Sequence, residues 1–180
     1  MALIHLITGG ARSGKSDHAL RLAENRSDNR AYVATCPVKD EEMRERVEKH
    51  RRRRQDRGWV TIEERTDLAA AVRGAGQKLL LIDCLTLWVS NLMEQKGNEL
   101  TEAEMERRSR AVLESCRDRD GAVFIVTNEV GMGVVPDNPA ARRFRDLAGR
   151  TNQVFAAEAD KVTLMVCGIA TEVKNEGRCK

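Results

Sequence analysis

The sequence predicts an α/β fold in which helices cover both faces of a mainly parallel sheet. Three observations support this fold class. Short runs of apolar, β-branched residues recur along the 180-residue chain, and most are continuous rather than alternating, as in strands buried on both faces. Helical patterns separate these runs. A glycine-rich segment joins the first apolar run directly to the first helical pattern.

Six apolar runs are expected to form strands, and the segments between them to form helices. The expected strands are 3–8, 31–36, 59–64, 78–84, 122–129 and 162–169. The expected helices are 16–25, 40–54, 86–95, 101–119 and 139–158. Strands that alternate with helices imply right-handed crossovers. Since the sequence shows no internal repeat or linker, residues 1–180 are expected to form one domain.

Local signals mark the starts of three of these helices. Thr101 and Glu104 form the pattern T-x-x-E, which is typical of a capping box. Pro139 occupies a first-turn position, where its missing N–H costs little. Acidic residues follow Asp40, where they interact favourably with the positive end of a helix.

Basic residues are concentrated in one segment of a nearly neutral chain. The net charge is +3, and 41% hydrophobic and 33% charged residues are ordinary for a globular protein. Between Arg44 and Arg57, eight Lys or Arg residues stand against three acidic residues, a net charge of +5. This segment suggests a phosphate-rich partner of limited size, and a solvated helix face is the alternative interpretation.

The cysteines give no sign of a disulfide framework or a zinc site, because their number is odd and no pair has the spacing C-x-x-C. They are Cys36, Cys84, Cys116, Cys167 and Cys179. The N-terminus lacks the features of a signal peptide, and no apolar run approaches the roughly 20 residues that span a bilayer. We therefore expect a cytoplasmic protein without membrane insertion.

The segment GGARSGKS fits the phosphate-loop pattern G-x-x-x-x-G-K-[ST]. It follows an apolar strand and opens a helix, which is the context that the motif requires. The residues expected to bind phosphate are Gly9, Gly10, Ala11, Arg12, Ser13, Gly14, Lys15 and Ser16. Lys15 is expected to reach the β- and γ-phosphates as a catalytic residue. The sequence therefore predicts a P-loop NTPase-like domain that binds a nucleoside triphosphate.

A carboxylate at the end of a strand completes the expected metal site. The run LLLID places Asp83 where a Walker B aspartate would lie, and the hydroxyl of Ser16 and the carboxylate of Asp83 are expected to hold Mg²⁺. The sequence contains no N/T-K-x-D guanine motif of a regulatory GTPase. The short chain fits a small-molecule kinase or transferase better than a motor or a switch.

The basic segment contains a histidine that is expected to face the protein. In a helix over 40–54, Met43, Val47 and His50 share the only apolar face, and Arg54 continues it. Neutral imidazole can attack phosphorus, and the surrounding guanidinium groups would stabilise a pyrophosphate leaving group. A partly buried histidine with a structural role is the alternative interpretation.

Seven segments occur in an order that resembles one enzyme family. They are ITGGARSGKS, YVAT, DEEMRERVEKHR, W-x-T-x-E (59–63), LIDCLTLWVSNL, VTNEVGMGVVP and RRFRDLAGRTNQ. Together they closely resemble the bifunctional adenosylcobinamide kinase / adenosylcobinamide-phosphate guanylyltransferase of cobalamin biosynthesis. The resemblance covers nearly the whole chain, and its last two segments are more specific than the phosphate loop.

The resemblance implies a homotrimeric enzyme with two steps. It implies phosphorylation of the corrinoid adenosylcobinamide with ATP or GTP, followed by transfer of GMP from GTP through a guanylylated histidine. The family's motif R-[IV]-x-x-H falls on residues 46–50, so His50 is the implied catalytic histidine. The implied nucleotide contacts are Gly9–Ser16, Thr35, Arg51, Arg52, Arg53, Arg54, Glu63 and Asp83. The corrinoid substrate comes from the resemblance alone.

Two other functions remain open from the residues themselves. A kinase without transferase activity would keep the phosphate loop and have no use for an inward His50. A P-loop ATPase could bind nucleic acid through Arg51–Arg54. With 3% aromatic residues the chain has little to stack on bases, so we expect no nucleic-acid partner.

Overall fold

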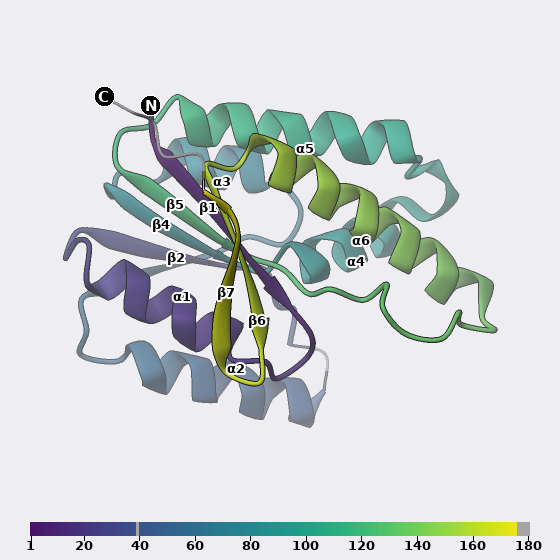
Figure 1. Ribbon diagram of the computed structural model, residues 1–180, viewed down its shortest axis with the longest axis horizontal. Coiled ribbons are helices and arrows are strands. Elements are labelled where there is room, and N and C mark those ends of the chain that lie inside the picture. The colour runs from purple at the N-terminus through teal and green to yellow at the C-terminus, as the bar shows by residue number, and fades with distance from the viewer. Residues whose placement is uncertain (39, 176–180) are drawn as a thin grey trace.

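The computed structural model describes residues 1–38 and 40–175 as an α/β fold (Figure 1). Its strands are β1 (Leu3–Gly9), β2 (Arg30–Ala34), β3 (Trp59–Glu63), β4 (Leu79–Asp83), β5 (Ala122–Val126), β6 (Lys161–Val166) and β7 (Ile169–Asn175). Its helices are α1 (Lys15–Glu24), α2 (Glu41–Arg54), α3 (Leu68–Gly74), α4 (Leu85–Lys96), α5 (Glu102–Arg117) and α6 (Pro139–Glu158), with a 3-10 turn η1 (Gly97–Glu99).

The strands form one sheet in the order β3-β2-β4-β5-β1-β6-β7. Every neighbouring pair is parallel except β6 and β7, which are antiparallel. The carboxyl ends of parallel strands lie at one edge of a sheet. The residues that follow β1, β2, β3 and β4 therefore lie at the same edge. The expected mainly parallel sheet is confirmed.

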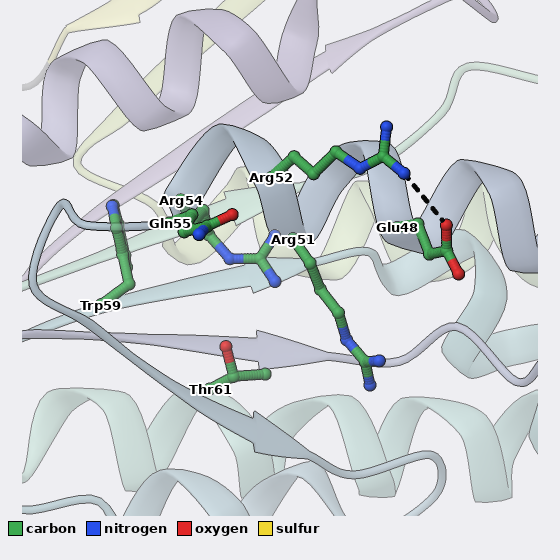
Figure 2. A pocket seen from close by; sticks show the side chains of 7 residues that line it. All are labelled: Glu48, Arg51, Arg52, Arg54, Gln55, Trp59 and Thr61. Carbon is green, nitrogen blue, oxygen red and sulfur yellow. Dashed lines mark hydrogen bonds and ion pairs between the residues drawn. The ribbon is translucent and has the colours of Figure 1, made fainter.

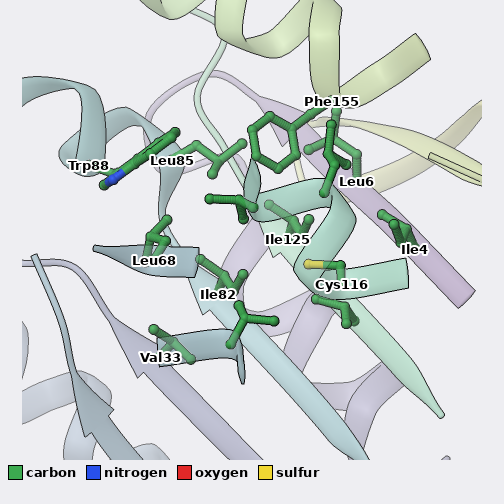
Figure 3. Close-up of a cluster of buried hydrophobic side chains, with 14 of the residues drawn as sticks. Ile4, Leu6, Val33, Leu68, Ile82, Leu85, Trp88, Cys116, Ile125 and Phe155 are labelled. Carbon is green, nitrogen blue, oxygen red and sulfur yellow. The ribbon is translucent and has the colours of Figure 1, made fainter. Parts of the chain in front are cut away.

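Helices cover both faces of the sheet. In Figure 1, α1 and α2 lie on one side, and α3, α4, α5 and α6 lie on the other. Successive side chains of a strand point to opposite faces. Ile4 and Leu6 of β1 therefore enter the larger core, whereas Ile7 enters the smaller core beneath α1. Figure 3 shows the larger core, where Phe155 of α6 lies edge-on to Trp88 of α4 at 6.5 Å between ring centroids.

All six expected strands and all five expected helices form, but α3 and β7 were not predicted. The seven residues of α3 are too few to show a helical repeat. The expected strand 162–169 is broken by a turn at Cys167 and Gly168, whose φ angles are 52° and 82°, and the chain returns as β7. Because β7 is an edge strand with both faces exposed, it lacks the buried apolar pattern of the other strands.

The local helix-start signals are only partly confirmed. The hydroxyl of Thr101 accepts the N–H of Glu104 at 3.2 Å, as in a capping box. The carboxylate of Glu104 instead binds Arg107 and Arg108, one turn along the same helix, so the reciprocal half of the box is absent.

No helix of the described residues is long and apolar enough to cross a membrane.

We predict that Phe155→Ala lowers the free energy of unfolding by about 3–5 kcal/mol, because the side chain is fully buried and its removal leaves a cavity. Phe144→Ala is the matched control on the same helix, since Phe144 is only partly buried. Chemical denaturation of both variants measures the two losses. An equal loss for both would contradict the placement of Phe155 at the centre of the core.

Candidate nucleotide-binding site

The phosphate loop runs from β1 into α1, as its sequence predicts. Gly9 has φ +147°, and an added Cβ would lie 2.4 Å from the carbonyl oxygen of Met165 on β6. Gly14 has φ +92° and caps α1 in a left-handed conformation. Only glycine meets both demands without strain. Gly10, Ala11 and Arg12 are exposed, so the loop presents its backbone outward at the start of a helix.

The side chain of Lys15 is folded back into this loop. Its exposed fraction is 6%, and Nζ donates to the carbonyl oxygen of Gly10 at 2.5 Å and to the Ser13 hydroxyl at 3.4 Å. Burial lowers the pKa of Lys15, and the negative charge of Asp83 opposes this shift. The two residues therefore lie close enough to interact electrostatically, which brings together two predicted parts of the site. The loop oxygens occupy positions that phosphate oxygens could take.

Asp83 ends β4 and is oriented by residues of β2 and of the turn that follows β2. The Tyr32 hydroxyl donates to Oδ2 of Asp83 at 2.9 Å. Thr35 is fully buried, and its hydroxyl donates to the carbonyl oxygen of Cys84 at 2.8 Å and accepts the N–H of Cys84 at 2.7 Å. The hydroxyl of Thr35, a predicted nucleotide contact, is thus engaged by the backbone next to Asp83. Burial, reinforced by the charge of Asp83, raises the pKa of Tyr32 well above its ordinary value.

The donor set at the carboxyl edge fits Mg²⁺. Ser16 in the first turn of α1 and Asp83 at the end of β4 offer hard oxygen ligands, and Mg²⁺ commonly takes one or two protein ligands beside phosphate and water. The described residues contain no group of three or more His, Cys, Asp or Glu that could hold a metal. In the described chain Cys36, Cys84, Cys116 and Cys167 form no disulfide, and Cys179 lies outside the described residues.

His50 lies on the inner side of α2, as its sequence spacing predicts. Met43, Val47 and His50 are all partly buried, whereas the residues between them whose side chains are described are exposed. Nδ1 of His50 is buried and has no hydrogen-bond partner in the part of the chain that the structure describes. A buried polar atom without a partner is rare in a native fold, and a catalytic role is one explanation for it.

The four arginines after His50 have four different environments. Arg54 is buried, with its guanidinium carbon 3.4 Å from the centroid of the Tyr32 ring, and its Nη1 donates to the carbonyl oxygen of His50 at 2.9 Å. Arg51 is paired with Glu63 of β3, and Arg53 with Asp17 of α1. Arg52 reaches Glu48 at 3.4 Å on the exposed side of α2. The prediction that Arg54 continues the inward stripe is confirmed.

A cavity of about 500 Å³ lies between α2 and β3. Its lining residues are Glu48, Arg51, Arg52, Arg54, Gln55, Trp59 and Thr61 (Figure 2). In Figure 2 the arginine side chains come from α2, with Arg52 directed toward Glu48, and Trp59 and Thr61 come from β3. Three guanidinium groups and one aromatic ring make it suitable for an anionic ligand that carries a planar group.

Sequence reasoning missed Tyr32 and Trp59. Tyr32 packs edge-on to Trp59 at 6.3 Å between ring centroids, and the Trp59 ring N–H donates to Glu24 of α1. Tyr32 lies in β2 and Trp59 begins β3, and both strands have an apolar pattern. In such a pattern an aromatic residue reads as part of the core, so its spacing gives no functional signal. Both residues begin segments of the family resemblance, YVAT and W-x-T-x-E, and these segments are the signal that could have singled them out.

Comparison with proteins of known sequence finds close relatives. Residues 5–173 match the CobU family, described as cobinamide kinase / cobinamide phosphate guanyltransferase. The chain is 40% identical over 180 residues to the bifunctional adenosylcobalamin biosynthesis protein CobU of Escherichia coli (strain K12), covering 94% of this chain and 98% of that protein. It is also 40% identical over 173 residues to the bifunctional adenosylcobalamin biosynthesis protein CobP of Pseudomonas aeruginosa, covering 95% of this chain and 97% of that protein.

Solved structures share the fold at much lower identity. A prototypical ATPase from the type III secretion system of pathogenic bacteria has a TM-score of 0.56 and 14% identity, covering 94% of this chain and 56% of that chain. Identity this low is informative about the fold alone. The likeness confirms the P-loop NTPase-like fold that the phosphate loop and the parallel sheet predict.

We predict that Lys15→Ala lowers the affinity for a nucleoside triphosphate about tenfold to a hundredfold, because a charge-assisted hydrogen bond to phosphate is lost. Isothermal titration calorimetry with a non-hydrolysable GTP analogue measures the change. Lys96→Ala, at the far end of α4, is the control. Unchanged affinity for the Lys15 variant would mean that the triphosphate binds elsewhere.

Proposed function

The chain belongs to the cobinamide kinase / cobinamide phosphate guanyltransferase family, and we propose that both of its reactions use the nucleotide site described above. The protein is a bifunctional transferase of cobalamin biosynthesis, with a kinase and a guanylyltransferase activity. In our proposal one domain, residues 1–180, carries both activities. The arrangement of its residues suggests how each step proceeds.

In the kinase step, the γ-phosphate of ATP or GTP lies against the phosphate loop. Lys15 turns from its loop partners to the β- and γ-phosphate oxygens, and the backbone N–H groups of the loop hold the others. The acceptor hydroxyl of adenosylcobinamide attacks the γ-phosphorus directly, the bond from that phosphorus to the β–γ bridging oxygen breaks, ADP or GDP leaves, and the hydroxyl proton passes to solvent. Ser16 and Asp83 would hold Mg²⁺, which neutralises charge on the phosphates.

In the guanylyl transfer step, His50 attacks the α-phosphorus of GTP. A phosphorus–nitrogen bond forms, the bond to the bridging oxygen breaks, and pyrophosphate leaves. The phosphate of adenosylcobinamide phosphate then attacks the same phosphorus and releases His50, giving adenosyl-GDP-cobinamide. The guanidinium groups around His50 stabilise the charge on the departing pyrophosphate.

One observation carries this proposal: the helix with His50 is tied to both predicted parts of the triphosphate site. Arg53 pairs with Asp17, two residues after Lys15 on α1. Arg54 lies on the ring of Tyr32, whose hydroxyl holds Asp83. A kinase without transferase activity gives no reason for a histidine on that helix whose Nδ1 is buried without a partner.

The environments of the arginines argue against nucleic acid as the partner. A strip that binds a phosphate backbone keeps its cations exposed and available. Here Arg54 is buried and Arg53 is paired with Asp17, so of the four arginines only Arg51 and Arg52 keep more than half of the side chain exposed. We therefore propose a small-molecule partner for this segment.

We propose two further features of the protein, its number of chains and its location. A homotrimer is implied by the family resemblance, and the exposed side chains of Ile169 and Val173 on β7 offer apolar surface for contacts between chains. A cytoplasmic location agrees with free thiols and with the need for ATP and GTP. Sedimentation of the purified protein measures the number of chains.

We predict that His50→Ala abolishes guanylyl transfer and retains much of the kinase activity, because only the second step needs a covalent intermediate. Label from α-labelled GTP should stay on the wild-type protein through denaturation. It should be lost in acid and persist in base, as expected for a phosphorus–nitrogen bond.

The control for this experiment is His18→Asn, which alters another half-buried histidine on α1 and should still take up the label. Label from γ-labelled GTP should not remain on any of the three proteins. Uptake of α-label by the His50→Ala protein would show that another residue is the nucleophile.

We also predict that EDTA abolishes both activities reversibly and that Mg²⁺ restores them, since Ser16 and Asp83 offer only oxygen ligands. Asp83→Asn should raise the Mg²⁺ concentration needed for half-maximal kinase activity. Elemental analysis of the purified protein should find no bound zinc. A stoichiometric zinc would contradict this assignment.

A further inference from the structure

The helix that carries His50 has little apolar attachment to the rest of the protein. No residue of α2 belongs to either hydrophobic core in the described chain. Of its two inward apolar residues, Met43 and Val47, neither is fully buried. We therefore expect the contacts of its arginines to contribute to its position. The ion pairs of Arg51 and Arg53 lie near the surface, where such pairs contribute little. Among the described side chains of α2, Arg54 alone is buried.

The ring of Tyr32, on which the Arg54 guanidinium lies, is buried and tightly surrounded. Its exposed fraction is 4%, it belongs to the smaller core beneath α1, and Trp59 packs edge-on against it. The Arg54 guanidinium lies over the ring face with its carbon 3.4 Å from the centroid. A buried cation over an aromatic face is among the stronger contacts of this type.

Tyr32 also contacts the carboxylate of Asp83, which is predicted to hold the metal. Its hydroxyl donates to Oδ2 of Asp83 at 2.9 Å and so leaves Oδ1 for another partner. Partners of this kind orient a ligating carboxylate, and their loss commonly weakens metal binding about tenfold to a hundredfold. Arg54 in turn donates to the carbonyl oxygen of His50. Tyr32 thus contacts Asp83 directly and is linked to His50 through Arg54.

We propose that Tyr32 is a positioning residue shared by the two transfer steps. Its hydroxyl orients Asp83 for the metal, and its ring seats Arg54, which fixes the last turn of α2 and with it His50. This inference rests on the proposed function for the roles of Asp83 and His50. The contacts themselves do not depend on either role, so they can be tested without any transfer reaction.

Three variants separate the two functions of the side chain. Tyr32→Phe keeps the ring under Arg54 and removes the hydroxyl from Asp83. Arg54→Met keeps the hydroxyl on Asp83 and removes the cation from the ring. Tyr32→Leu removes both. Arg51→Met is the matched control for Arg54→Met, because it removes a guanidinium from the same helix at an exposed position.

The first measurement is Mn²⁺ binding by electron paramagnetic resonance, in the presence of a GTP analogue with an α,β-methylene bridge that His50 cannot cleave. Tyr32→Phe should raise the Mn²⁺ dissociation constant about tenfold. With the analogue at a saturating concentration, Arg54→Met should leave this constant within about twofold of the wild type, because the hydroxyl of Tyr32 still binds Asp83. Unchanged Mn²⁺ binding by Tyr32→Phe would overturn the metal half of the proposal.

The second measurement is amide hydrogen exchange of residues 50–54 in the protein without nucleotide. Arg54→Met should speed exchange about tenfold, whereas Tyr32→Phe and Arg51→Met should leave it close to the wild-type rate. If exchange is as slow in Arg54→Met as in the wild type, the proposal that Arg54 fixes the last turn of α2 is wrong. Tyr32→Leu should show both defects, and if it does not fold, the other variants still decide the question.

The two measurements also distinguish failure of this inference from failure of the proposed function. A wild-type protein that takes up no α-label would disprove the guanylyl-histidine step. Mn²⁺ binding and hydrogen exchange would still report whether Tyr32 holds Asp83 and the end of α2. Conversely, normal labelling together with unchanged binding and exchange in all variants would leave the function standing and reduce Tyr32 to a core residue.

Discussion

The contact between the Arg54 guanidinium and the Tyr32 ring is the interaction on which the arrangement of the site depends. Burial lowers the pKa of Arg54, so removing this cation from water has a cost. The aromatic face, the charge of Asp83 and the carbonyl oxygen of His50 offset that cost. Since α2 adds nothing to the hydrophobic cores, this contact largely determines where the helix ends and where His50 lies.

The parallel sheet supplies the rest of the geometry. Four parallel strands end at Gly9, Ala34, Glu63 and Asp83. One edge of the sheet therefore carries the phosphate loop, Thr35, Glu63 and the carboxylate predicted to hold the metal. Ligands of open α/β sheets bind outside the carboxyl ends of the strands for this reason. Residues far apart in sequence thereby meet without any long loop. The helix with His50 connects two of these strands, β2 and β3, and so is placed beside the same edge.

The sequence was most informative where one physical requirement fixes the residue type. In the phosphate loop, residue 9 must be glycine because it closely approaches β6, and residue 14 because it caps α1 in a left-handed conformation. Both glycines are part of the sequence motif, so the sequence shows them directly. The inward direction of His50 and Arg54 followed from helical spacing. Tyr32 was missed because its hydroxyl contact with Asp83 joins strands 51 residues apart, and no local pattern reports such a pair. The strand β7 was missed because an exposed edge strand needs no apolar pattern.

The central claim is that one triphosphate site on each chain serves both transfer steps. Its most direct test is the number of nucleotides bound per chain, measured by equilibrium dialysis with the α,β-methylene analogue of GTP in excess Mg²⁺. The account predicts one nucleotide per chain, because the phosphate loop that delivers the γ-phosphate also holds the triphosphate that His50 attacks. Two nucleotides bound to each chain at saturation would contradict it, since kinase and guanylyl transfer would then draw on separate sites.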